Sequence, residues 1–381
     1  MRASTAFALG LFALDVACMP VYRSSLKEIP PEAPGFREVV QVRFLGVGGF
    51  SLRRGDDVVL TAPLYSNPSI EELDLQKRDL TPNLGLIEKF HPPMDGVKAI
   101  LVGHAHYDHL MDVPYVWAKT PEAVIYGNTS MKNILAGYAP GAGGGDVPRI
   151  PSDKVRALDH AGENVVDYRM CLQNQGPREL ARGRVDESEM SGEWVYVPGS
   201  RIRIRALCSE HPAQILSTIH LWPGCIHLPR FAPPDRSEDY QEGETLAYLI
   251  DFLAADGKTP LFRIYYQDAP TNETIGEIPE ELKEEKAVDL ALLCVGTFFA
   301  VDRPTHIVEN TDARYIILSH WENFFRPQDQ KLKGIPFAKV RRVVSEVQKA
   351  APDAEVFLPA PQTMFHLRQG ARGVEMVGAR D

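Results

Sequence analysis

The sequence predicts a layered α/β sandwich on the basis of three observations. Short apolar runs that are typical of strands dominate the early part of the chain. Strand and helix patterns alternate at two places further on, and no internal repeat or long low-complexity tract interrupts them. The chain has 381 residues, of which 44% are hydrophobic and 24% charged, which is enough to bury a sizeable core. We expect layers rather than one doubly wound sheet.

The N-terminal part, residues 1–23, has the features of a leader. Arg2 precedes a short apolar stretch that is too short to span a bilayer but suits the core of a signal peptide. The sequence Leu14-Asp-Val-Ala-Cys18 then resembles a bacterial lipobox, in which the cysteine is acylated, although Asp15 stands where an aliphatic or small residue is usual. We expect a lipoprotein of the bacterial cell envelope that is anchored to the membrane through Cys18. Simple secretion and a cytoplasmic location are the alternatives.

The rest of the chain is expected to form one domain behind a linker. Residues 24–39 contain a Pro-rich stretch and are assigned to the linker, and residues 40–381 to the domain. Four cysteines follow Cys18, and in an oxidising compartment they could pair. No two of them are close enough in sequence to suggest a redox or zinc-knuckle motif. The net charge of −10 argues against a nucleic acid as partner, because binding to phosphates depends on Lys and Arg.

The expected strands are apolar or alternating runs bounded by turn residues. Arg201 to Ala206, for example, alternates arginine with apolar residues, as a half-buried strand does. The turn Arg54-Gly55-Asp56 should join the first two strands as a hairpin. The expected strands span residues 40–52, 57–61, 97–102, 123–126, 201–206, 246–252, 261–266, 290–295, 315–318 and 355–358.

Three helices are expected between or after these strands. They span residues 110–118, 130–138 and 337–350. Thr129 is available to cap the second helix, and the third carries Lys and Arg along its polar face.

The most informative motif follows the strand expected at 97–102. His104, His106, Asp108 and His109 lie within six residues, although the whole chain has only 11 histidines. Neutral imidazoles and carboxylates are ligands of zinc and similar divalent ions. A catalytic ion also needs an open position for water, so further ligands must come from elsewhere in the chain. The motif therefore predicts a metal site on a loop between a strand and a helix.

With His-Ala-His-Tyr-Asp-His on such a loop, the chain resembles the metallo-β-lactamase-fold hydrolases over roughly Val40 to Leu367. It looks most like the branch that contains N-acylphosphatidylethanolamine-hydrolysing phospholipase D and L-ascorbate-6-phosphate lactonase. The resemblance implies a four-layer αββα sandwich in which two metal ions lie at one edge of two packed sheets. It also implies that the later ligands come one at a time from the ends of strands.

Three later residues match that pattern. His211 follows the strand at 201–206 and would complete the first metal site with His104 and His106. Asp268 ends an apolar strand where the family places a carboxylate that bridges both ions, although Gln267 and Ala269 replace the usual neighbours. His320, in Ser319-His320-Trp321, would bind the second ion with Asp108 and His109.

One position departs from the family. The early Thr-Asp-Pro, whose carboxylate supports the metal site from outside, is Thr61-Ala62-Pro63 here. The resemblance therefore implies that a supporting contact is missing or replaced.

The remaining histidines have weaker claims to a functional role. His220 and His227 lie in an insertion, residues 212–243, that is rich in Pro and aromatic residues and would form either a lid over the metals or a surface excursion. His91, His160, His306 and His366 lack a ligand-like context and are expected to be structural. Tyr107 would pack beneath the loop or act in catalysis.

The expected function is a dinuclear metal-dependent hydrolase with two divalent ions, zinc first among them. A metal-bound hydroxide would attack a phosphodiester, phospholipid-like or lactone substrate, and Asp108 would steer the nucleophile or relay a proton. The alternatives are a di-iron oxidoreductase of the same fold and a non-catalytic metal-binding surface lipoprotein. His106 stands against the di-iron enzyme, in which Glu usually enters the motif. The partner would be a small molecule or a lipid, and the sequence leaves the oligomeric state open.

Overall fold

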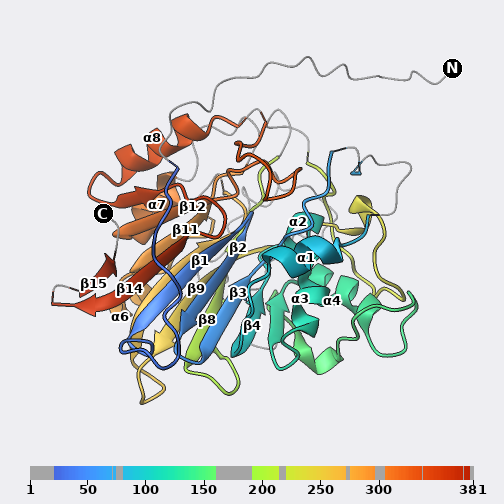
Figure 1. The fold of residues 1–381 in the computed structure, drawn as a ribbon, viewed down its shortest axis with the longest axis horizontal. Coiled ribbons are helices and arrows are strands. Elements are labelled where there is room, and N and C mark those ends of the chain that lie inside the picture. Colours follow the sequence, from blue (N-terminus) through green and yellow to red (C-terminus); the bar gives the residue numbers. More distant parts are fainter. Residues whose placement is uncertain are drawn as a thin grey trace.

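The computed structural model describes most of the chain. The described residues are 21–70, 72–73, 80–159, 191–213, 220–271, 275–296, 305–336, 338–371 and 373–377. The proposed leader with Cys18 lies outside them, as do Cys171 and His160. Two β-sheets lie face to face, and helices flank them on either side (Figure 1).

The first sheet contains eight strands. They are β1 (Val39–Gly46), β2 (Gly49–Arg54), β3 (Asp57–Thr61), β4 (Val97–Leu101), β5 (Val124–Gly127), β6 (Val155–Ala157), β14 (Met364–Gly370) and β15 (Gly373–Val377). Their order is β15-β14-β1-β2-β3-β4-β5-β6. β1, β2 and β3 pair as antiparallel hairpins, whereas β4, β5 and β6 continue the sheet in parallel beside β3.

The second sheet contains seven strands. They are β7 (Val195–Tyr196), β8 (Ile202–Ser209), β9 (Thr245–Leu253), β10 (Pro260–Gln267), β11 (Leu290–Cys294), β12 (Tyr315–Ser319) and β13 (Glu355–Phe357). Their order is β13-β12-β11-β10-β9-β8-β7. β10 to β13 are parallel, and β9 is antiparallel to both β8 and β10. β8, β10 and β12 therefore run in the same direction, and their carboxyl ends lie at the same edge of the sheet.

Helices cover the outer faces of the sheets. They are α1 (Leu84–Phe90), α2 (Tyr107–Leu110), α3 (Val113–Ala118), α4 (Thr129–Leu135), α6 (Glu280–Glu285), α7 (Thr305–Thr311) and α8 (Val340–Ala350). In Figure 1, α1 to α4 group on the right of the sheets and α7 and α8 on the left. No described helix is long and apolar enough to cross a membrane.

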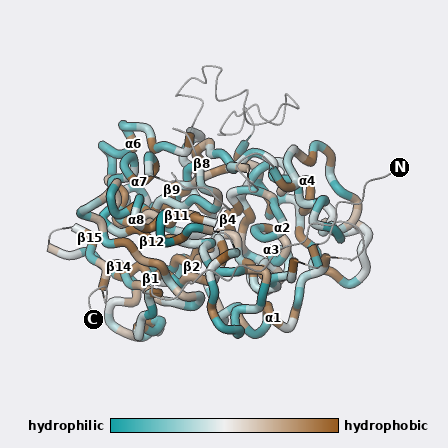
Figure 2. Tube along the Cα trace, turned by 90° about the horizontal axis from the view of Figure 1, so that it is seen from above, coloured by the Kyte–Doolittle hydropathy of each residue, from teal (hydrophilic) through white to brown (hydrophobic). Residues whose placement is uncertain are grey.

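Three apolar clusters hold these layers together. Along β9, Tyr248 and Ile250 belong to the cluster between the two sheets, whereas Leu249 belongs to the cluster beneath α6, α7 and α8. Successive residues of a strand point to opposite faces, so a strand that is apolar throughout fills two layers of core. A third cluster lies beneath α1 to α4, on the outer face of the first sheet. Figure 2 shows the hydrophobic residues concentrated on the central strands. The predicted layered α/β sandwich is confirmed, with four layers.

The predicted strands are confirmed, with one exception. The segment 40–52 is two strands and not one, because the chain turns sharply at Val47 and Gly48 between β1 and β2. Val47 has a φ of 53°, a backbone conformation that β-branched residues seldom adopt, but Gly46, Gly48 and Gly49 around it are a turn signal that the single-strand prediction overlooked. The hairpin at Gly55-Asp56 is confirmed.

The helix predictions were partly wrong. The helix expected at 110–118 is two short helices, α2 and α3, and the third helix begins at Val340. Asn128 caps α4 in place of Thr129, since its side chain accepts a hydrogen bond from the backbone N–H of Met131. The elements α1, α6, α7, β14 and β15 were not anticipated, because they are short or strongly polar.

A buried ionic network ties β8, β9 and β10 to α6. The side chain of Asp251 accepts hydrogen bonds from Arg263 at 2.8 Å through both oxygens, and one from Arg203 at 2.9 Å. Glu285 bridges the same two arginines, with N–O distances of 2.8 Å. Arg203 also lies 3.9 Å from the ring centre of Trp194. Asp251 and Arg263 are fully buried, so each charge depends on its partners for solvation.

We expect Asp251→Ala to lower the free energy of unfolding by about 3–5 kcal/mol, because two buried guanidinium groups lose their shared carboxylate. Urea denaturation followed by circular dichroism measures this change. Asp56→Ala is the matched control, since Asp56 pairs with Arg37 at the surface and both side chains are more than half exposed. Similar losses in the two variants would contradict a dominant role for the network.

Candidate metal centre

The motif loop follows β4 and is held tightly against the second sheet. The peptide of Gly103 lies directly over the carboxylate of Asp268, and a Cβ atom at Gly103 would come within 2.2 Å of Asp268 Oδ1. Only glycine fits at this position. The chain then passes His104 and His106 and forms the first turn of α2, which carries Asp108 and His109. All four motif side chains are buried.

The other three predicted residues approach from the second sheet. His211 lies two residues beyond the end of β8, Asp268 directly follows β10, and His320 directly follows β12. Because these three strands end at the same edge of the sheet, their following residues meet there. The structure thus brings all seven sequence-predicted residues together in three overlapping groups that could hold a metal ion.

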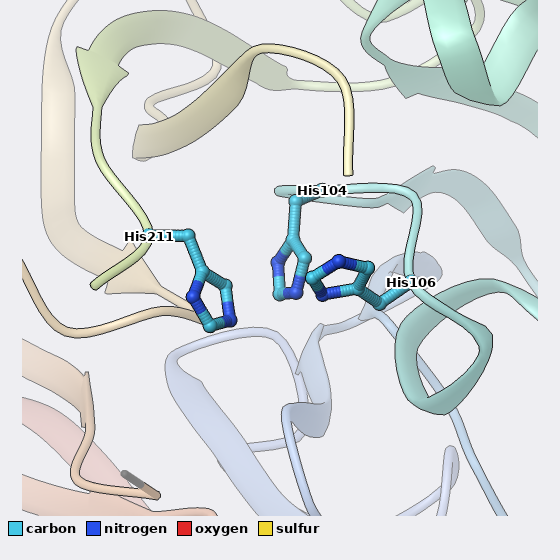
Figure 3. A group of neighbouring side chains, drawn as sticks. All are labelled: His104, His106 and His211. Atoms are coloured by element: carbon cyan, nitrogen blue, oxygen red, sulfur yellow. The ribbon is translucent and has the colours of Figure 1, made fainter. Parts of the chain in front are cut away.

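His104, His106 and His211 form the first group. Figure 3 shows their rings turned toward one another, and the ring centres of neighbouring pairs are 4.7–5.1 Å apart. Each residue offers one ring nitrogen, and these three atoms all lie within 4.8 Å of one another.

Each of these rings has one nitrogen beside an acceptor. His104 Nδ1 lies 2.9 Å from Asp268 Oδ1, His106 Nε2 lies 3.3 Å from the carbonyl oxygen of Trp222, and His211 Nδ1 lies 2.8 Å from that of Pro212. A carbonyl or carboxylate oxygen only accepts, so these contacts assign the ring proton to the named nitrogen. The opposite nitrogen then carries the lone pair, and His104 Nε2 is buried without a hydrogen-bond partner among the described residues.

Asp108, His109 and His320 form the second group, adjoining the first. Asp108 Oδ2 lies 3.2 Å from His320 Nε2 and 3.5 Å from His109 Nε2. The rings of His104 and His109 have centres 4.2 Å apart, so the two groups are in contact through these rings. A third group of His104, His109 and Asp268 links them.

The dimensions of the first two groups suit divalent ions. Zinc binds imidazole and carboxylate atoms at about 2.0–2.2 Å, so two ligands of one ion are at most about 4.4 Å apart. The ligand atoms of each group lie within 4.8 Å of one another, and in the second group Asp108 lies 3.2 and 3.5 Å from its two partners. Both groups are therefore of the size that one ion requires.

Burial dominates the titration of the histidines. It lowers the pKa of His106 and of His109 to about 3, and it holds the pKa of His104 and His211 well below the usual value. These imidazoles are therefore neutral at physiological pH, which is the form that binds metal.

Asp108 and His320 behave as a pair. Burial alone would raise the pKa of Asp108, but the charges of His109 and His320 and the hydrogen bond from His320 outweigh it and lower that pKa. Burial alone would lower the pKa of His320, but the same hydrogen bond and the charge of Asp108 raise it. Asp108 is therefore an ionised carboxylate, as a metal ligand must be.

The backbone around His320 is held in an unusual conformation. His320 has a φ of 59°, and its N–H donates to the carbonyl oxygen of Val47 at 3.0 Å. The N–H of Val47 donates in turn to the buried carboxylate of Glu322. Gly296 leaves room for the ring, since a Cβ there would come within 2.4 Å of His320 Nδ1. The sequence gave no sign of these supports, because they join residues far apart in the chain.

Asp112, also not anticipated, fixes the chain segment after β3. Its carboxylate accepts hydrogen bonds from the N–H groups of Tyr65 and Ser66 at 2.7 and 2.8 Å, and from the hydroxyl of Ser66 at 2.6 Å.

At position 62, where the resemblance implied a missing carboxylate, Ala62 is buried and its N–H donates to the carbonyl oxygen of Leu101.

Aromatic side chains flank the ligand groups. Trp222 packs edge-on against His106 and Tyr107, and Phe324 packs edge-on against His320. Trp222 belongs to the insertion at 212–243, so this part of the insertion lies against the site. Further along it, Leu228 and Phe231 are 78% and 90% exposed.

The remaining predicted residues lie elsewhere. The described metal-capable groups contain no histidine besides the five above. His91 contacts the hydroxyl of Tyr65 at 3.1 Å, and His366 is buried on β14. Of the described cysteines, Cys225 is disulfide-bonded and Cys208 and Cys294 are free and buried.

Comparison with known proteins gives distant structural neighbours. No family model and no curated protein match the chain. A metallo hydrolase from Ignicoccus hospitalis is 12% identical with a TM-score of 0.43, over 86% of this chain and 98% of that one. The metallo-β-lactamase fold protein YhfI from Bacillus subtilis is 11% identical with a TM-score of 0.45, over 86% and 99%.

Another neighbour has a different printed activity. CmlA, a diiron β-hydroxylase from Streptomyces venezuelae, is 11% identical with a TM-score of 0.45, over 88% of this chain and 55% of that one. The neighbours are thus metallo-β-lactamase-fold metal-dependent hydrolases together with a diiron hydroxylase. Likenesses this distant leave the chemistry of the site to be argued from its own residues.

The free energy of unfolding should depend on pH through Asp112, which fixes the chain segment after β3. Burial raises the pKa of Asp112 from 3.8 to about 6, against the opposing effect of its hydrogen bonds from Ser66 and Tyr65. The folded state therefore favours the protonated carboxyl. This contribution is complete below about pH 4 and is lost as the pH rises through about 6, by on the order of 2–3 kcal/mol.

We expect Asp112→Asn to flatten the difference in unfolding free energy between pH 4 and pH 7, because an amide does not titrate. Its oxygen can accept both N–H groups while its NH₂ donates to Ser66. Parallel urea titrations of the metal-free variant and wild type across this range measure the effect. An identical pH slope in the two proteins would contradict it.

Proposed function

We propose that the protein is a metal-dependent hydrolase that holds two divalent ions, zinc foremost, in the first and second ligand groups. The observation that carries this proposal is the way the ring nitrogens of the first group are arranged. Each of His104, His106 and His211 has one nitrogen on an acceptor and the other directed into a shared space. A histidine cluster that served packing alone would leave the buried Nε2 of His104 without a partner, which is costly.

The donor set of the second group supports the same proposal. Asp108, His109 and His320 combine one ionised carboxylate with two imidazoles, a mixture that suits zinc and related ions. With three protein ligands in each group, a fourth position would be open to water or substrate, as catalytic sites require.

When bound, two such ions would lower the pKa of a water molecule and polarise the carbonyl or phosphoryl oxygen of a substrate. The residues of the chain would then have separate roles. Asp108, the most exposed of the four motif residues at 8%, would steer the attacking water or relay its proton. His109 and His320 would hold the second ion together with Asp108. Tyr107, buried against Trp222, would pack beneath the loop.

The surroundings of the ligands favour a substrate with an apolar part. Trp222 lies beside the first group and Phe324 beside the second, so an apolar chain or ring next to the reacting bond would contact both. We therefore propose a phosphodiester, phospholipid-like or lactone substrate, in line with the branch that contains N-acylphosphatidylethanolamine-hydrolysing phospholipase D and L-ascorbate-6-phosphate lactonase. The exposed Leu228 and Phe231 support a substrate that is presented by a lipid surface.

We also propose a location in the bacterial cell envelope, with the chain anchored through Cys18. The disulfide at Cys225 supports an oxidising compartment, because disulfides are rare in the cytosol. An envelope lipid would then be the substrate within reach.

We expect His104→Ala and Asp108→Ala each to reduce turnover by at least about 10²- to 10³-fold, because the charge stabilisation lost with an ion is worth several kcal/mol. Zinc-loaded full-length protein is assayed against bis(p-nitrophenyl) phosphate, p-nitrophenyl esters and a panel of lactones. Elemental analysis of the same samples should give two equivalents of zinc in wild type and fewer in His104→Ala.

His227→Ala is the control, because His227 is an exposed histidine outside the ligand groups. Turnover and metal content should match wild type. Unchanged turnover in either ligand variant would reject the assignment, and iron with a visible redox spectrum in wild type would point instead to an oxidoreductase.

A further inference from the structure

We propose that the tip of the insertion, residues 226–234, is a docking surface for a phospholipid bilayer, and that the side chains of Leu228 and Phe231 enter the lipid. This inference deepens the proposed function and rests on it only in the claim that docking brings a substrate to the metal site. The docking itself is a property of the surface and needs no bound metal.

Leu228 and Phe231 are the most exposed large hydrophobic side chains among the described residues. Their exposed fractions are 78% and 90%, whereas those of Ile70, Leu84 and Tyr196, which come next, are 54–57%. Apolar surface gains free energy when it is removed from water, so neighbouring apolar side chains that are almost fully exposed are typical of an interaction site.

The backbone of the tip is fixed to the body of the protein, so this exposure is part of the fold. Asn133, a buried residue of α4, holds the tip at two points. Its side-chain NH₂ donates to the carbonyl oxygen of Ile226 at 2.7 Å, and its own carbonyl oxygen accepts from the N–H of Arg230 at 2.9 Å. The carbonyl oxygen of Phe231 accepts from the N–H of Gly143 at 2.8 Å. Because the loop is already ordered, docking costs little conformational entropy.

The tip carries little charge that would oppose its entry into lipid. Arg230 is the only Lys, Arg, Asp or Glu among residues 226–234, although the chain has 51 acidic and 41 basic residues. The guanidinium group of Arg230 pairs with Asp239 at 2.9 Å. Asp235 and Arg236 follow the tip and are exposed, so charged groups border it. An apolar centre with a charged border suits the interface of a bilayer, where apolar side chains reach the acyl boundary and charged groups stay in water.

The size of the tip favours a lipid surface over a protein partner. A stable protein interface buries about 800 Å² and about 20–30 residues on each side, far more than two apolar side chains at the end of a loop provide. A bilayer needs no matching shape, and partial burial of one Leu and one Phe is worth about 10- to 100-fold in affinity. Only side chains would enter the hydrocarbon, because an irregular backbone cannot satisfy its polar groups there.

The tip is close to the metal centre along the chain. Trp222, which packs against His106, precedes Leu228 by six residues. An extended chain covers at most about 3.6 Å per residue, so Trp222 and Leu228 are no more than about 22 Å apart. Between them, the N–H of Ile226 donates to Ser130 Oγ at 2.9 Å and holds this segment on α4. Docking through the tip would therefore keep the ligand groups near the lipid surface, where substrates with an apolar part are concentrated.

The first test places a tryptophan at position 231 of the full-length protein. Vesicles of phosphatidylethanolamine and phosphatidylcholine with brominated acyl chains quench a tryptophan that enters the lipid. We expect stronger quenching in Phe231→Trp than in wild type. Tyr196→Trp should stay at the wild-type level, because Tyr196 is also exposed but lies on β7, the edge strand of the second sheet.

Both variants keep the N-terminal segment, so any attachment through that segment affects them equally. Equal quenching in the two variants, or quenching of neither above the wild-type level, would overturn the proposal.

The second test measures the affinity of full-length variants for the same vesicles by sedimentation. The double variant Leu228→Asp/Phe231→Asp should bind about 10- to 100-fold more weakly than wild type, because two apolar groups are lost. Tyr196→Asp should bind as wild type does. Equal affinities of the double variant and Tyr196→Asp would overturn the proposal. A dimer in wild type that the double variant abolishes, seen by sedimentation velocity without vesicles, would identify a second copy of this chain as the occupant and would also overturn it.

A third measurement separates this inference from the proposed function. His104→Ala lacks a ligand histidine and should dock on vesicles as wild type does. If wild type hydrolyses none of the test substrates but docks through the tip, the hydrolase fails and the docking surface stands. If wild type and the double variant hydrolyse soluble bis(p-nitrophenyl) phosphate equally and neither binds vesicles, the hydrolase stands and the docking surface fails.

Discussion

The concentration of buried imidazoles and carboxylates at one edge of two sheets is the constraint on which the rest of the structure depends. Such groups are costly to bury unless each has a partner. The protein supplies partners from backbone carbonyls, from Asp268 and from within the groups, and those partners come from distant parts of the chain. Two turns with left-handed residues, at Val47 and His320, exist where these contacts require them. The sandwich provides rigid strand ends, and the site determines the shape of the loops.

Much of the fold could be predicted because buried strands have a simple signature. The runs that became β4, β9, β11 and β12 are apolar on both faces, since one face meets the other sheet and the other meets helices. The turn between β1 and β2 was missed although glycines flank Val47; what could not be predicted is the left-handed conformation of Val47 itself, which distant hydrogen bonds stabilise. β14 and β15 were missed because their polar residues hide the alternation, and pairing with β1 is what makes them strands.

In the candidate site too, residues in a local sequence motif could be predicted, and residues whose role depends on distant contacts could not. Spacing alone drew attention to the motif at His104 to His109, and the resemblance to a fold supplied His211, Asp268 and His320 as residues at strand ends. Glu322 and Asp112 had no signature, since each acts on backbone groups hundreds or tens of residues away. The carbonyl oxygen of Trp222 could not have been found at all, because every residue has one. Sequence patterns locate donors to a metal more readily than the groups that orient them.

The close approach of Gly103 to Asp268 has an evolutionary consequence. The carboxylate occupies the space that any larger residue at position 103 would need, and it also bonds to the peptide of that glycine. A change at either position alone would therefore disturb the other. Among descendants of this chain the two positions should be retained together or replaced together, so a relative that lacks the glycine should also have lost the aspartate. Covariation between residues 165 positions apart would then record a single contact.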